Sequence, residues 1–357
     1  MTTATAPRLN DLKLLVRRRS VAYFGWLGYG NMGDEALFDA ADRLLGGETP
    51  LRPFPQGRRL SRLIAWAPTR LADAVVLGGG TLIGTATFRE ALEAVRSCGP
   101  AFTFGSGVED PQHDGSGQVA AELDRWAELL AGFQRVTVRG PLSAELLRER
   151  GVAADVVGDP ALALPRWYPG APAPAAEPVL GLNIAAPQRG WGADPERLVE
   201  VLETVAREKL RQGWRVRIVP LWARDLEVAR ALAQRLGDRA ELFAGFERLP
   251  LLLEAISGCT TVVGVKLHSV IFASAYGVPS VMLGYERKCD DFMASVGRDR
   301  YTLRTDRATA ADVLASLADL EADLPGHRRE IAAAVAQRCV TLDRLASQLR
   351  VALGAAQ

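Results

Sequence analysis

Short apolar runs alternate with amphipathic stretches along the first half of the chain. The apolar runs predict strands at 21–27, 74–77, 100–104, 136–138 and 156–157. The stretches with helical periodicity predict helices at 35–45, 88–97 and 142–150, the last of which begins after Pro141 and ends at Gly151. Such alternation favours a parallel sheet that is covered by helices on both faces.

The same pattern starts again after residue 178. Apolar runs predict strands at 179–184, 214–219, 241–243, 261–263 and 280–283, with helices at 195–211, 226–236 and 249–257 and one or two closing helices over 327–353. The segment 165–178 contains five prolines and predicts a linker. We therefore predict an α/β protein with two doubly wound, Rossmann-like domains, 1–170 and 171–357, that face a cleft. The last helices are free to pack back on the first domain.

Cationic side chains and a histidine gather in segment 264–288. Lys266 and His268 follow the predicted strand 261–263, and Arg287 and Lys288 follow the strand 280–283. In an open parallel sheet, ligands bind where strands end and helices begin, so the segment predicts a site for a small anion. His268, with an unperturbed pKa of ~6.5, is suited to proton transfer. A packing role is the plainer alternative for a lone histidine.

Arg189 is a further candidate ligand for an anion. It lies in the loop after the first strand of the second half, which is expected to face the cleft. A guanidinium there can hold a phosphate or a carboxylate through two hydrogen bonds. A solvated loop arginine is the alternative.

The segment Gly28–Gly33 has the form G-x-G-x-x-G, which is also the dinucleotide-binding pattern. Asp34 and Glu35 follow at once and place two carboxylates in the first helical turn, where they would repel a pyrophosphate. The same groups suit sugar hydroxyls, so Asn31, Gly33, Asp34 and Glu35 are candidate contacts to a sugar. The alternative is a tight turn in which Asp34 caps the helix.

Three glycines and a threonine follow the predicted strand 74–77. Glycines at 78–80 leave backbone N–H groups bare for a close ligand, which makes Gly79, Gly80 and Thr81 further candidates for sugar binding. The alternative is a turn that only lets a helix and a strand pack closely.

Charge and composition restrict the classes of function and the location that the sequence allows. The net charge of +1 gives no reason to expect nucleic acid, and the four cysteines form no CxxC pair, so no metal site is predicted. The N-terminus lacks an apolar signal core and no apolar run approaches the ~20 residues of a membrane span, so we expect a cytoplasmic protein. Basic residues interleaved with apolar ones fit either peripheral contact with anionic lipid or a solvated helix edge: Arg52, Arg58, Arg59, Arg62 and Arg70.

Six motifs in order make the chain resemble the polysaccharide pyruvyltransferases. They are GYGNMGDE at 28–35, VLGGGTL at 76–82, VRGPLS at 138–143, GDPA at 158–161, KLH at 266–268, and GVP at 277–279 with YERK at 285–288. The resemblance implies a glycosyltransferase-B-like fold. It also implies transfer of pyruvate from phosphoenolpyruvate, as a co-substrate rather than a cofactor, to two hydroxyls of one sugar. The product is a cyclic ketal, and phosphate is released.

The resemblance also implies roles for the candidate residues. Phosphoenolpyruvate would bind the second domain through Lys266, Arg189, Arg287 and Lys288, and the sugar would bind the first. His268 and Asp34 would move protons. The family usually has arginine where Lys266 stands, so lysine keeps the charge without the planar fork.

Three questions stay open at this level. The acceptor can be a lipid-linked oligosaccharide, a repeat-unit sugar of a cell-surface glycan or a nucleotide-sugar. A nucleotide-sugar-dependent glycosyltransferase of the same fold is the alternative enzyme. A sugar-binding protein without catalysis is the alternative outside enzymes.

Overall fold

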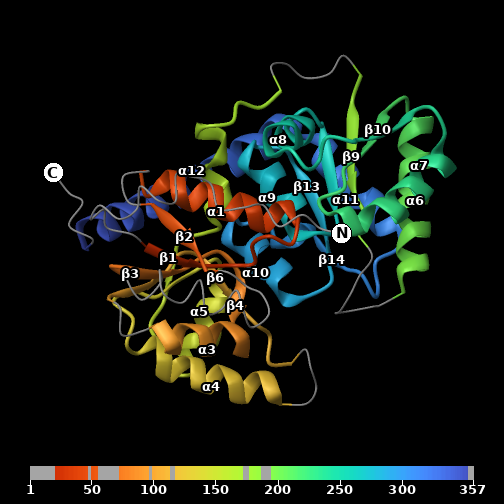
Figure 1. Cartoon of the computed structure of the whole chain (residues 1–357). Helices are drawn as coiled ribbons and strands as arrows, with labels where there is room; N and C mark the ends of the chain where they lie inside the picture. Colours follow the sequence, from red (N-terminus) through yellow and green to blue (C-terminus); the bar gives the residue numbers. More distant parts are fainter. Residues whose placement is uncertain are drawn as a thin grey trace, which may run out of the picture.

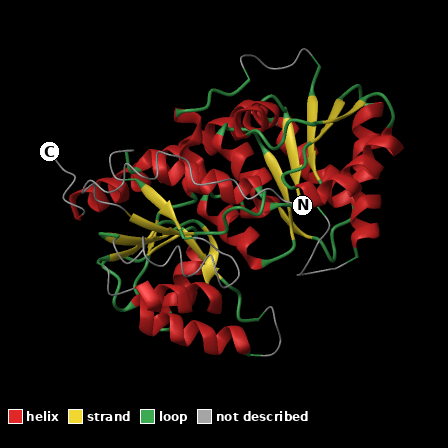
Figure 2. Cartoon of the chain, in the orientation of Figure 1, coloured by secondary structure: helices red, strands yellow, loops and turns green. Residues whose placement is uncertain are grey.

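A computed structural model describes residues 21–46, 50–54, 72–95, 99–112, 117–171, 177–185 and 194–352 of the chain (Figures 1 and 2). Parallel strands alternate with helices in both halves, which confirms the predicted α/β class. The N-terminal strands and the C-terminal sheet form two separate layers of strands, each flanked by helices (Figure 2).

The second half contains a six-stranded parallel sheet in the order β11-β10-β9-β12-β13-β14. Its strands are β9 (Val179–Asn183), β10 (Arg215–Ile218), β11 (Ala240–Leu242), β12 (Thr261–Gly264), β13 (Ser280–Gly284) and β14 (Thr302–Arg304). Its helices are α6 (Pro195–Arg211), η4 (Ala223–Asp225), α7 (Leu226–Leu236), α8 (Leu249–Ser257), α9 (Leu267–Ala275), α10 (Arg287–Ser295), η5 (Asp299–Tyr301) and α11 (Ala310–Ala322). The order reverses between β9 and β12, so their C-terminal ends flank a switch point, where open sheets bind ligands.

The first half contains two four-stranded parallel sheets rather than the single sheet predicted. Their orders are β2-β1-β3-β5 and β4-β6-β7-β8. The strands are β1 (Val21–Phe24), β2 (Leu51–Pro53), β3 (Ala74–Leu77), β4 (Gly80–Ile83), β5 (Ala101–Thr103), β6 (Ser106–Val108), β7 (Thr137–Val138) and β8 (Asp155–Val156). The helices are α1 (Met32–Leu44), α3 (Ala86–Val95), α4 (Gln118–Leu130), α5 (Pro141–Arg148) and η3 (Pro160–Arg166).

Glycines explain why the first sheet is divided. The triple glycine lies between β3 and β4, and Gly80 has φ +93°. Gly105, with φ +69°, separates β5 from β6 in the same way. Residues with a side chain avoid such backbone angles, so both strands bend at the same level and continue into a second sheet. The triple glycine therefore lies at a break within a strand path, and its last member, Gly80, begins β4.

The start of the predicted linker is helical. Pro165 lies inside the 3₁₀ helix η3, whose residues Ala161, Leu162 and Leu164 pack in the core of the second half. Asp159 begins this helix, because its side chain accepts a hydrogen bond from the N–H of Ala161 at 3.0 Å. The apolar residues of η3 are buried.

The C-terminal helix α12 (Leu324–Ala352) runs from the second half to the first (Figure 1). Its buried residues Leu342, Leu345 and Leu349 join the core of the first half, and Arg350 donates to the carbonyl of Leu44 at 2.8 Å. The helix α1 contributes to both cores. Its first turns join the core of the second half through Met32, Ala36, Leu37 and Ala40, and its end joins that of the first half through Ala41 and Leu44. The helices α1 and α12 thus connect the two halves.

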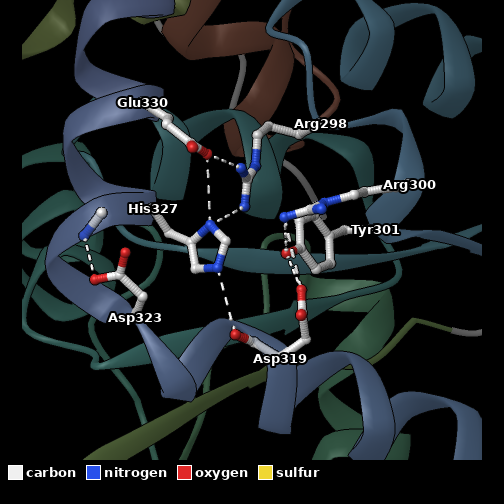
Figure 3. Close-up of polar contacts among 8 residues, drawn as sticks. Arg298, Arg300, Tyr301, Asp319, Asp323, His327 and Glu330 are labelled. Carbon is white, nitrogen blue, oxygen red and sulfur yellow. Dashed lines mark hydrogen bonds and ion pairs between the residues drawn. The ribbon is translucent and has the colours of Figure 1, made fainter.

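A polar cluster fastens the start of α12 to the second half (Figure 3). The guanidinium of Arg298 donates to Glu330 at 2.7 Å and lies 3.0 Å from Nδ1 of His327. Tyr301 stands edge-on to His327 and donates its hydroxyl to Asp319 of α11. These contacts tie three helical elements together. They also account for His327 as a structural residue.

Candidate functional site

A cleft of about 1060 Å³ lies between the two halves, at the C-terminal ends of their strands. Two loops meet beside it. The indole N–H of Trp222 donates to the carbonyl of Tyr29 at 2.8 Å, and the N–H of Met32 donates to the carbonyl of Leu221 at 3.0 Å. The loop after β1 is therefore fixed by the loop after β10, and the cleft is bounded by both domains.

Lys266 lines this cleft at the start of α9. Its backbone N–H donates to the side chain of Asn183 at 2.8 Å, which joins the ends of β9 and β12. Its ammonium lies 3.5 Å from the buried carboxylate of Asp225 and 4.7 Å from the centroid of the Trp222 ring. Burial lowers the pKa of Lys266 from its usual value, and Asp225 opposes that shift. Burial also raises the pKa of Asp225 to about 6. Its Oδ2 has no hydrogen-bond partner, so the carboxylate nearest to Lys266 is incompletely hydrogen-bonded.

His268 also lines the cleft, in the first turn of α9. Burial and, to a smaller extent, the nearby cations Arg139, Lys288 and Lys266 together lower the pKa of its imidazole to about 3. Its Nε2 is buried and has no hydrogen-bond partner. A neutral imidazole with an unsatisfied nitrogen, placed among cations, is suited to an anion that brings its own hydrogen-bonding group.

Asp34 lies in the first turn of α1 and also faces the cleft. Burial raises the pKa of its carboxyl to about 7, against the opposing effect of Lys288 and Lys266. Asn31 donates from its side-chain amide to Asp34 at 2.6 Å. Asn31, and not Asp34, is the N-cap of α1, because its side-chain oxygen accepts from the N–H of Gly33. Asp34 is therefore left to change its protonation state near neutral pH.

Lys288 and Arg287 have different surroundings. Lys288 lines the cleft and pairs with Glu286 at 2.5 Å. Burial opposes its charge, but Tyr285 and Glu286 hold its pKa above the usual value. Arg287 is not among the residues that line the main cleft, and its guanidinium lies 3.8 Å from Asp110.

Arg139 is a cleft residue that sequence reasoning missed. It follows β7 and is almost completely buried, with a side-chain nitrogen 3.4 Å from the hydroxyl of Thr81. Its Nε has no hydrogen-bond partner, and its nearest carboxylate, Asp291, is 4.0 Å away. A buried guanidinium that lacks a close counter-ion is expensive and fits a site for a bound anion. The sequence feature that could have identified Arg139 is its position directly after a predicted strand, within the VRGPLS motif.

The predicted sugar contacts divide into two groups. Asn31, Asp34, Gly80 and Thr81 line the cleft together. The others, Gly33, Gly79 and Glu35, are absent from the cleft lining and have packing or turn contacts instead. A Cβ on Gly33 would lie 2.2 Å from the imidazole of His268, and one on Gly79 would lie 2.6 Å from Leu37. Glu35 accepts from the N–H of Gly28 at 2.8 Å and fixes the preceding loop.

Some sequence predictions fall outside the described residues. Arg189 and most of the basic cluster, from Arg58 to Arg70, lie there. Within the described ranges, no three metal-ligating side chains gather into a possible metal site. The helices described here include none with the length and apolar character to cross a membrane.

Comparison with solved structures defines the class of fold. The chain superimposes on the S. aureus MnaA–UDP co-structure with a TM-score of 0.64 at 11% identity, covering 95% of this chain and 97% of that one. A Neisseria meningitidis UDP-GlcNAc 2-epimerase bound to UDP-GlcNAc gives 0.58 at 11%, covering 92% and 99%. The calicheamicin glycosyltransferase CalG4 gives 0.51 at 15%, covering 95% and 99%. The protein therefore has the two-domain Rossmann-like fold of glycosyltransferase-B enzymes and related epimerases.

Comparison with protein families is more specific. The model of the polysaccharide pyruvyl transferase family matches residues 31–287, which include Asp34, Arg139, Lys266 and His268 and extend over most of the chain. The chain belongs to this family. Among curated proteins, none matches the sequence significantly. Family membership makes the protein a transferase of the polysaccharide pyruvylation class, as the motifs indicated.

Proposed function

We propose that the protein transfers the pyruvyl group of phosphoenolpyruvate to two hydroxyls of one sugar and forms a ketal. The observation that carries the proposal is the neutral imidazole of His268, whose buried Nε2 lacks a partner and which lies near three cations, Arg139, Lys266 and Lys288. Phosphoenolpyruvate brings a phosphate and a carboxylate, which would pair with these cations.

The reaction needs protons to move in both directions. A proton is added to the methylene carbon of phosphoenolpyruvate, and a sugar hydroxyl forms a bond to the central carbon. The bond from that carbon to the phosphate oxygen then breaks, and the second hydroxyl forms the other ketal bond. Of the two hydroxyl protons, one balances the proton taken up by the methyl group and one leaves with phosphate.

His268 and Asp34 are the groups suited to these transfers. A bound phosphate and carboxylate would raise the pKa of His268 from about 3, so the imidazole would gain a proton when the donor binds and could pass it on. The carboxyl of Asp34, with a pKa of about 7, is partly ionised at neutral pH and can take a proton from a sugar hydroxyl. Arg139 and Lys288 would hold the phosphate as its negative charge develops.

The acceptor follows from the family and the cleft only in broad terms. We propose that it is a sugar of a cell-surface glycan or of its lipid-linked precursor, and that the reaction takes place in the cytoplasm. No cofactor is needed for the steps above. Arg189 remains a proposed donor ligand, since it follows β9 in the sequence and β9 pairs with β12, the strand that precedes Lys266.

The test is phosphate release combined with product mass. Purified enzyme is incubated with phosphoenolpyruvate and a panel of free and lipid-linked glycans, and we expect release of phosphate with a gain of ~70 Da on one glycan, as a ketal requires. His268→Ala should abolish both while phosphoenolpyruvate still protects against heating. Stabilisation by UDP-sugars but not by phosphoenolpyruvate would instead identify a glycosyltransferase. Wild-type turnover by His268→Ala would remove the assigned role.

A further inference from the structure

One wall of the cleft, which we name the cationic wall, carries Arg139, Lys266 and Lys288 around His268. A second wall of the cleft has a different chemistry. It is built by four N-terminal segments: the loop after β1, the end of β4, the end of β6 and the start of α4. We name this surface the aromatic wall, and its side chains are Trp26, Tyr29, Thr85, Glu109 and Asp110. None of the described cleft residues that these four segments contribute is a lysine or an arginine.

The wall is one continuous surface. Trp26 packs edge-on against Phe88, with ring centroids 4.9 Å apart, and Phe88 follows Thr85 by one helical turn. On the other side, a Cβ on Gly84 would lie 2.7 Å from the Cβ of Glu109, so β4 and β6 end side by side. The aromatic rings and the carboxylates therefore adjoin the same strand end.

Tyr29 exposes a large aromatic ring inside the cleft. Its side chain is 47% exposed, and the only other exposed large hydrophobic side chains in the described part of the chain are Val340 and Val351, which lie outside the cleft. Its ring stands 5.9 Å from that of Trp26 at 65°. The bond from Trp222 to its carbonyl fixes its backbone. Flat rings that line a polar cleft provide the apolar surface on which the C–H face of a sugar ring packs.

The carboxylates of Glu109 and Asp110 determine which ligand charge the aromatic wall favours. Asp110 is held by the N–H of Gln112 at 3.0 Å and by Arg287 at 3.8 Å. Glu109 is placed by its own backbone N–H, which donates to the carbonyl of Ile83 at 2.8 Å. Ionised carboxylates only accept hydrogen bonds, as sugar hydroxyls can supply, and they repel a nearby carboxylate or phosphate.

We propose that the aromatic wall is a subsite for an uncharged pyranose ring of the acceptor glycan. It would hold that ring by stacking on Trp26 and Tyr29 and by hydroxyl bonds to Thr85, Glu109 and Asp110. The inference rests on the proposed function and adds to it that the sugar at this wall carries no carboxylate or phosphate. The cationic wall around His268 would hold the pyruvyl donor opposite.

Calorimetry with neutral disaccharides, and with the same disaccharides carrying one ring oxidised to a uronic acid, tests the subsite. We expect wild type to bind at least one neutral disaccharide and to bind its uronic counterpart about tenfold more weakly. Tyr29→Ala should weaken the neutral disaccharide about tenfold, and Glu109→Gln should reduce the preference to less than about threefold. Val340→Ala and Glu247→Gln, which change exposed residues outside the cleft, are the matched controls.

Phosphoenolpyruvate binding is measured on the same samples by thermal shift. All variants should keep wild-type stabilisation, because none of them changes the cationic wall. Failure of wild type to bind phosphoenolpyruvate would contradict the proposed function. Normal donor binding with no affinity for any neutral disaccharide, equal affinity for uronic ones, or an unchanged Tyr29→Ala variant would overturn the subsite alone.

Discussion

Gly33 of α1 and His268 of α9 lie in direct contact across the two domains. A Cβ built on Gly33 would stand 2.2 Å from Nδ1 and 2.8 Å from the Cβ of the histidine. The clash includes the root of the side chain and not only its tip, so His268 cannot avoid it by a small rotation. The glycine therefore permits the first turn of α1 to lie against the imidazole, with Asp34 as the next residue and in the same cleft.

We expect Gly33→Ala to reduce kcat by about 100-fold or more, because displacement of a catalytic group by about 1 Å has that effect. Phosphate release in the presence of donor and acceptor measures it. Gly213→Ala is the control, since its Cβ would meet no atom within 4 Å, although its φ of +87° adds local strain. A Gly33→Ala enzyme with wild-type kcat would show that the contact does not position His268.

Asp34→Asn should make the protein inactive and, above pH 7, more stable. Burial raises the pKa of Asp34 to about 7 from an ordinary value near 4, so between these values the folded state binds more protons than the unfolded state. Stability from this group is therefore lost as pH rises through that window. The asparagine variant lacks this loss and should gain roughly 1–3 kcal/mol at pH 8.

Urea unfolding of both proteins at pH 4 and pH 8 measures the difference. At pH 4 the carboxyl of Asp34 is protonated in the folded state, so the advantage of the variant should be small. Equal stability of the two proteins at pH 8 would contradict the raised pKa.

Asp291 of α10 caps a helix of the other domain. Its carboxylate accepts from the N–H groups of Leu142 and Ser143 at 2.9 and 3.0 Å and from the hydroxyl of Ser143 at 2.7 Å. We expect Asp291→Ala to cost about 3 kcal/mol, since it removes a buried charged cap and leaves Arg139 without its nearest carboxylate. Ser143→Ala should cost about 1 kcal/mol.

Chemical unfolding and the KM for phosphoenolpyruvate separate the two effects of Asp291. We expect Asp291→Asn to keep most of the stability, because its amide oxygen can still accept from the helix. It should lower the KM for phosphoenolpyruvate, because loss of the carboxylate charge near Arg139 strengthens the attraction of the guanidinium for an anion. An Asp291→Ala variant no less stable than Ser143→Ala would show that the cap contributes little.

Arg298 and Arg300 offer a matched pair in the cluster of Figure 3. The side chain of Arg298 is 6% exposed and that of Arg300 is 61% exposed, although both contact the ring of Tyr301. Arg298→Ala should destabilise the protein by about 3 kcal/mol, because it breaks a buried network. Arg300→Ala should cost less than about 1 kcal/mol. Thermal unfolding measures both, and equal losses would contradict the importance of burial.

The sequence determined the elements that periodicity encodes strongly. The helices α6, α7 and α8 have the predicted bounds, and β3 matches as well, because regular amphipathic spacing and buried apolar runs are local signals. The sequence analysis did not predict α4, β4 or β6. These strands are three or four residues long and begin after glycines, so local propensity opposes them and tertiary contacts decide.

The same division holds for the site. Residue type and strand-end position alone pointed to Lys266, His268, Lys288 and Asp34, since the ends of parallel strands meet at one edge. The sequence could not show that Arg139 lies buried with an Nε that lacks a hydrogen-bond partner, or that the guanidinium of Arg287 lies 3.8 Å from Asp110. It also could not separate Gly33, which packs on a histidine, from Gly80, which lines the cleft. Those distinctions depend on which distant side chains the fold places within a few ångströms, and no spacing along the chain encodes that distance.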